Sequence, residues 1–98
     1  MTEKIVTFDT SGYLKTDRDV AEYLAAAFET NDPDDVTHAL ATIARARGVT
    51  GLSRKSGVAR GTLNKAIGEG ANPTLGTLLS LMAALEMNLT VKPKAAAA

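Results

Sequence analysis

Cysteine and tryptophan are absent from this 98-residue sequence, and phenylalanine and tyrosine occur only twice each. Without cysteine, the chain can form neither a disulfide nor a thiolate metal site. So few aromatic residues do not provide a stacking platform for single-stranded nucleic acid. No apolar run approaches the roughly 18 residues that span a bilayer, and the N-terminus lacks a secretion signal. We therefore expect a cytoplasmic protein that does not enter a membrane.

Groups that could carry out catalysis are also scarce. The single histidine, His38, follows Asp34 and Asp35 on a predicted helix, but no nucleophile, second histidine or cysteine cluster completes a site. The glycine-containing segment 68–70 follows a predicted helix instead of a strand and lacks the lysine of a phosphate-binding loop. The sequence therefore predicts a protein that is not an enzyme and that binds neither a metal nor a cofactor.

Acidic and basic residues are equal in number, at eleven each, but they occupy different parts of the chain. Residues 1–35 contain nine acidic and three basic residues, whereas residues 36–98 contain eight basic and two acidic ones. A basic segment suits the phosphate backbone of DNA, because counterion release supplies most of the sequence-independent affinity. An acidic segment suits a basic partner, although acidic residues also gather where they cap helices. The charge pattern therefore indicates two different partners.

The first half of the chain predicts two helices within a single domain with a modest core. Thr16 is a suitable N-cap, with an acidic residue at the third helical position, and this helix should stop near Thr30. Asp32 and Pro33 then suit the N-cap and the first position of a second helix, which should end at Gly48.

The C-terminal part predicts a strongly apolar helix and a short strand. Thr74 suits the N-cap of this helix, whose apolar stripe we expect to close the core beneath the preceding elements; the stripe consists of Leu75, Leu78, Leu79, Met82 and Leu85. Apolar and polar residues alternate over 88–93, which favours a short terminal strand. Its partner would be residues 5–8 of the same chain or a second subunit.

Residues 49–68 form the stretch around which the chain is organised, because they predict two short helices joined by a tight turn. Thr50 suits the N-cap of the first helix, and Gly57 can adopt the left-handed conformation that a reversal needs. Leu63 begins the apolar face of the second helix. In such a helix-turn-helix the start of the second helix meets base edges in the major groove, while its flanks meet phosphates.

The opposite face of that second helix carries side chains that can read DNA. Arg60 and Lys65 can donate to guanine O6 and N7, and Asn64 can pair with adenine. Gly61 offers no direct readout; its value would be close approach of the backbone, at a cost of roughly 1 kcal/mol of helix stability relative to alanine. The alternative is that these residues are the solvated face of an ordinary helix. The small residue Ser53, the turn glycine and the apolar residue six positions later occur together at the offsets of the motif, which favours DNA contact.

These features resemble the Cro/C1-type (Xre-like) helix-turn-helix family, in which about five helices pack around the motif. More narrowly, the arrangement over roughly residues 8–93 is similar to the antidote proteins of HigA-like addiction modules, the two-gene toxin–antitoxin systems of bacteria. The matching residues are Tyr23-Leu24, Asp32-Pro33, Ile43-Ala44-Arg45-Ala46-Arg47-Gly48, Gly57, Arg60, Leu63, Lys65-Ala66, Asn72-Pro73-Thr74 and Leu89-Thr90-Val91. We therefore expect an all-α, lambda-repressor-like domain, with an acidic N-terminal arm and helix at 1–31, the core at 32–93 and a tail at 94–98.

Members of that family neutralise a small basic ribonuclease toxin of the RelE/HigB type and repress their own operon as dimers. The resemblance therefore implies three partners: operator double-stranded DNA, a toxin and a second copy of the chain. It implies DNA-binding positions at Arg54, Lys55, Arg60, Gly61, Thr62, Asn64 and Lys65. Charge and resemblance together assign toxin binding to Asp17, Asp19, Glu22 and Tyr23. For the dimer contact we favour the C-terminal helix with the strand that follows it.

Two other functions fit the same residues. A stand-alone repressor without a toxin would have the same fold and the same DNA-binding face. A helix-turn-helix module that binds proteins instead of DNA is the other, because Ala59 stands at the N-cap of the second helix, where relatives often carry serine, and alanine is a poor cap by roughly 1 kcal/mol.

Overall fold

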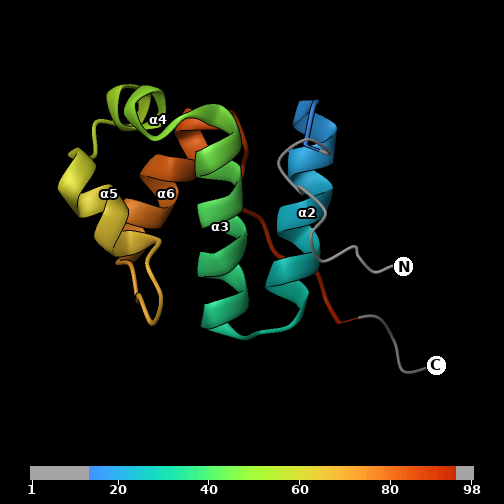
Figure 1. The fold of residues 1–98 in the computed structure, drawn as a ribbon. Coiled ribbons are helices and arrows are strands. Elements are labelled where there is room, and N and C mark those ends of the chain that lie inside the picture. The colour runs from blue at the N-terminus through green and yellow to red at the C-terminus, as the bar shows by residue number, and fades with distance from the viewer. Residues whose placement is uncertain (1–13, 95–98) are drawn as a thin grey trace, which may run out of the picture.

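The computed structural model describes residues 14–94, and within this range it contains five helices and no strand. The helices are α2 (Asp17–Glu29), α3 (Pro33–Arg47), α4 (Val49–Ser56), α5 (Arg60–Ala66) and α6 (Leu75–Ala84). In Figure 1, α2 and α3 run side by side, and α4, α5 and α6 gather on the other side of α3. This arrangement confirms the prediction of an all-helical fold with about five helices.

Local signals at the start of α2 and α3 produce the predicted caps. The hydroxyl of Thr16 accepts a hydrogen bond from the backbone N–H of Asp19 at 3.0 Å, and the Asp19 carboxylate accepts from the N–H of Thr16 at 3.1 Å. Asp32 accepts from the N–H of Asp34 at 2.9 Å, and Pro33 is the first residue of α3. The groups that cap each helix are therefore encoded within four residues of its start.

The junction between α3 and α4 corrects one prediction. Gly48 ends α3 and also serves as the N-cap of α4, which begins at Val49, so Thr50 lies in the first turn and does not cap it. The two helices meet without a loop because Gly48 has φ +92°, a conformation that residues with a Cβ rarely adopt. No side chain caps α4.

The core draws one or more residues from each helix. Val20 of α2, Ile43 of α3, Leu63 of α5 and Leu81 of α6 are its largest fully buried side chains. Leu52 of α4 is also buried and packs in the same cluster. Leu63 thus anchors α5, the shortest helix, to the centre of the domain.

The helix α6 and the segment after it differ from expectation in two ways. Leu75 and Leu79, which the periodicity places on the core stripe, are 66% and 45% exposed, and Leu81 is buried in their place. Residues 88–93 form no strand, because the described chain offers them no strand to pair with, and Val91 is 92% exposed. The segment 5–8, one of its predicted partners, lies outside the described residues.

The C-terminal segment instead returns toward α2, as Figure 1 shows. The ammonium group of Lys92 lies 3.1 Å from the carboxylate of Glu29, at the end of α2. Both side chains are well exposed, so this ion pair contributes little to stability by itself. No helix within residues 14–94 has the length and apolar character needed to cross a membrane.

Candidate nucleic-acid interface

The turn between α4 and α5 is held by hydrogen bonds from small side chains. Gly57 adopts the left-handed conformation with φ +77°, as predicted, and its N–H donates to the carbonyl of Ser53 at 3.0 Å. The Ser53 hydroxyl then donates to the carbonyl of Val58 at 2.6 Å, across the turn. Ser56 accepts from the Val58 N–H at 3.1 Å. The sequence analysis identified Ser53 only as a small residue of the motif; in the structure its hydroxyl also joins α4 to the turn.

The orientation of α5 follows from its buried residues. Leu63 has no exposed surface and Ala66 is buried, so the remaining residues of this short helix must face outward. Gly61 and Lys65 lie two residues before and two residues after Leu63, which at 100° per residue places both on the side opposite to it. The outward face of α5 is therefore centred on these two positions.

All seven predicted DNA-binding residues are exposed on the α4–α5 unit. Arg54 and Lys55 occupy the last turn of α4, and the other five, namely Arg60, Gly61, Thr62, Asn64 and Lys65, belong to α5. Within the described part of the chain, none of the four cations among them forms an ion pair with a carboxylate. The structure thus brings these residues onto two contacting helices and leaves their positive charges available to an anionic partner.

The start of α5, within this candidate interface, has no side-chain cap. Ala59 accepts the first helical hydrogen bond, from the N–H of Leu63 at 2.8 Å, but it has no side-chain group that can cap the helix. This confirms the prediction of a poor cap at this position. The order of α5 therefore depends mainly on the burial of Leu63 and Ala66.

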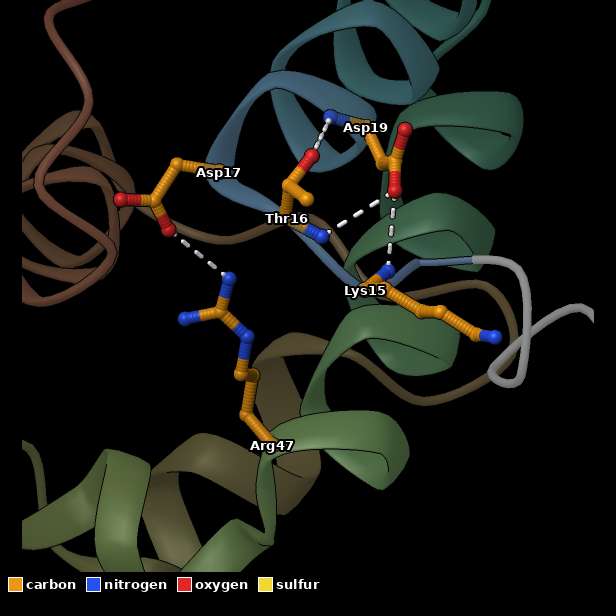
Figure 2. Close-up of polar contacts among 5 residues, drawn as sticks. All are labelled: Lys15, Thr16, Asp17, Asp19 and Arg47. Atoms are coloured by element: carbon orange, nitrogen blue, oxygen red, sulfur yellow. Dashed lines mark hydrogen bonds and ion pairs between the residues drawn. The ribbon is translucent and has the colours of Figure 1, made fainter.

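The predicted toxin-binding residues lie on α2, at the other end of the molecule from α5 (Figure 1). Figure 2 shows that Asp17 pairs with Arg47 of α3, at 3.1 Å, while Asp19 accepts hydrogen bonds from the N–H groups of Lys15 and Thr16. The bond from Thr16 is the main reason why the pKa of Asp19 lies below its ordinary value. Asp19 is thus occupied in capping α2.

The other two residues of this set differ in their exposure. Glu22 pairs with Arg18 one turn earlier, at 3.2 Å, and its side chain remains 61% exposed. Tyr23 is half-buried against the core. Asp17 and Glu22 are therefore the two most exposed carboxylates of the set, and each forms an ion pair with one arginine.

The pair between Arg47 and Asp17 was not expected from sequence. Thirty residues separate the two, and no local pattern connects them. Arg47 directly precedes Gly48, the shared residue between α3 and α4, so the pair links the start of α2 to the entrance of the helix-turn-helix. The only sequence feature that favours such a contact is the excess of acidic residues in 1–35 and of basic residues in 36–98.

The single histidine lies on α3 beside a polar groove. His38 lines a polar groove between α3 and the loop after α5, together with Asp34, Asp35, Arg45 and Glu69. Among residues 14–94, no group of three or more histidine, aspartate or glutamate side chains is arranged to hold a metal ion.

Comparison with known proteins supplies the family. A family model described as "Probable addiction module antidote protein" matches residues 4–93, which is most of the chain. The chain belongs to this family. A protein of Haemophilus influenzae, described only as uncharacterized, is 32% identical over 92 residues, covering 94% of this chain and 95% of that protein. No solved structure significantly matches this chain. The family description suggests an antitoxin role, and an antidote implies a toxin as its partner.

Proposed function

We propose that this protein is an antitoxin with two separate surfaces, one for operator DNA and one for its toxin. The observation that carries the proposal is the position of Arg60 and Lys65 on the outward face of α5, where they form no ion pair with any residue of 14–94. The exposed acids of α2 lie at the opposite end of the molecule. Separate surfaces allow both partners to bind the same copy. In this proposal the protein is not an enzyme and acts by binding alone.

The proposed DNA surface consists of α5 in the major groove and the end of α4 beside the phosphates. Arg60, Asn64 and Lys65 have the donors and acceptors that read guanine and adenine edges. Arg54 and Lys55 are placed to neutralise phosphates, which supplies the salt-dependent share of the affinity. Binding to the DNA upstream of its own gene would make the protein an autorepressor.

A mobility shift with that upstream DNA at two salt concentrations tests this surface. Arg60→Ala and Lys65→Ala should weaken binding through the loss of base contacts. Arg54→Ala and Lys55→Ala should each reduce the slope of log affinity against log salt by about 0.9, because each removes a phosphate contact. Lys94→Ala is the matched control, because it removes the same charge from the exposed C-terminal segment. If Arg60→Ala and Lys65→Ala bind as tightly as the wild type and the Lys94→Ala control, α5 is not the DNA-binding element.

The proposed toxin surface is the exposed side of α2, and the expected partner is a small basic ribonuclease of the RelE/HigB type. Glu22→Lys should weaken toxin binding, because it reverses a charge that is mostly exposed. Glu86→Lys makes the same change just after α6 and serves as the control. Equal toxin affinity of the two variants, measured by calorimetry with the product of the neighbouring gene, would place the toxin elsewhere.

Operator binding by paired half-sites would require two copies of the chain. The exposed apolar residues Leu75 and Leu79 on α6, with Leu89 and Val91 after it, are the surface we assign to that contact. Leu79→Asp should therefore convert a dimer into a monomer in sedimentation experiments. A wild-type protein that sediments as a monomer at the concentrations used for DNA binding would rule out this assignment.

A further inference from the structure

Gly61 lies on the outward face of α5, and nothing in the fold requires a glycine at this position. It is the second residue of the helix, is exposed, and lies on the side opposite to Leu63. Its φ is not positive, in contrast to Gly48, Gly57 and Gly70. A Cβ added to Gly61 would meet no atom within 4 Å. Alanine would therefore fit there without strain.

An alanine at this position would also make α5 more stable, because glycine is the poorest helix former after proline. The helix already lacks a side-chain cap at Ala59 and is only seven residues long. Glycine lowers the stability of this helix, and a side chain at position 61 would contact nothing inside the protein. The role of Gly61 must therefore lie in contact with an external partner.

The neighbours of Gly61 limit what can approach. Arg60 and Lys65 extend long side chains from the same exposed surface, so Gly61 is a gap between them at which a partner can reach the main chain. A position without a side chain has no polar group with which to read the donors and acceptors of a base edge. The group in the major groove that requires only space and apolar contact is the 5-methyl group of thymine.

We propose that Gly61 accommodates a thymine methyl group, and so selects an A·T pair at one position of each operator half-site. The inference rests on the proposed DNA binding and adds a base preference to it. Gly61 acts by the absence of a Cβ: the α5 backbone lies against the methyl group, and any side chain at this position would push the helix out of the groove.

The test compares wild type, Gly61→Ala and the control His38→Ala. Alanine at position 61 should raise the melting temperature by up to about 4 to 8 °C; this is the shift for a glycine in a helix interior, and Gly61 lies in the first turn of α5. Because the added Cβ would occupy the space of the methyl group, the same variant should bind the upstream DNA about tenfold more weakly, a loss of about 1.4 kcal/mol. His38→Ala also places a better helix former at an exposed position, on α3 outside the helix-turn-helix, and should raise the melting temperature without weakening binding.

Replacing thymines by deoxyuridine, one half-site position at a time, identifies the methyl group. At one position the replacement should restore the affinity of Gly61→Ala, while weakening that of the wild type. If no deoxyuridine position restores the variant, or if Gly61→Ala binds as tightly as the wild type, the inference is wrong and the proposed DNA binding stands. If the wild type binds no duplex at low salt, the proposed function fails, and the inference fails with it.

Discussion

The uncapped start of α5 allows a direct test of how this helix is held in place. Ala59 has φ −59° and ψ 146°, close to the φ −68° and ψ 160° of Thr74, which caps α6 by accepting from the N–H of Thr77 at 3.1 Å. A threonine at position 59 therefore needs no change of backbone to accept from the N–H of Thr62 in the same way. We expect Ala59→Thr to stabilise the protein by about 1 kcal/mol.

The control for this prediction is Ala59→Val, because valine has nearly the shape of threonine but no hydroxyl. The threonine variant should melt about 4 to 8 °C above the valine variant. In urea, followed by circular dichroism, its midpoint should lie roughly 0.3 to 1 M higher, given slopes of about 1 to 3 kcal/mol/M for small domains. If the two variants unfold together, the hydroxyl does not cap α5, and the helix start must differ from the one described.

Three further changes test the core, the turn and the cap of α2. Leu63→Ala removes a side chain with no exposed surface and should cost about 2 to 5 kcal/mol in urea denaturation, with a loss of DNA binding because α5 loses its anchor. Gly57→Ala forces a Cβ into the left-handed conformation and should lower the free energy of unfolding by about 1 to 2 kcal/mol. Asp19→Asn should flatten the loss of stability on acidification: the hydrogen bond from Thr16 lowers the pKa of Asp19 below its ordinary 3.8, so the cap is complete above that pH and is lost as the pH falls through the folded-state pKa.

Each of the three has an outcome that contradicts its reasoning. A Leu63→Ala variant that unfolds at the wild-type urea concentration would mean that α5 is not anchored through this residue. A Gly57→Ala variant as stable as the wild type would mean that the turn does not require the left-handed conformation. For Asp19→Asn the decisive observation is the acid titration of stability below about pH 4, where an unchanged slope would show that the carboxylate does not cap α2.

The features that sequence predicted correctly are those set by a few neighbouring residues. The caps at Thr16, Asp32 and Thr74 depend on groups within three residues of each helix start, and the left-handed Gly57 depends on itself alone. The poor cap at Ala59 was predictable for the same reason. Local hydrogen-bond chemistry is therefore sufficient to place these helix boundaries.

The features that sequence predicted wrongly depend on parts of the chain that are far apart. Thr50 is a good N-cap by composition, but the φ of Gly48 lets α3 continue directly into α4, so no cap position is left for it. The periodicity of α6 cannot tell which leucines meet the core, and Leu75 and Leu79 do not. The alternation over 88–93 cannot supply the neighbouring strand that a β-ladder needs.

The helix that carries the proposed readout is also the one with the least local support. α5 is seven residues long, has no side-chain cap, and contains a glycine that its fold does not require. It is positioned from outside itself, by the hydrogen bond from Ser53 to Val58 across the turn and by the burial of Leu63. Such a helix gains order when a partner binds it, because the partner then shares the cost of fixing its backbone. A change that only strengthens the cap, such as Ala59→Thr, should therefore tighten DNA binding, whereas Gly61→Ala strengthens the same helix and should weaken binding. Opposite effects on affinity from two stabilising changes two residues apart would separate the order of α5 from the shape of its outward face.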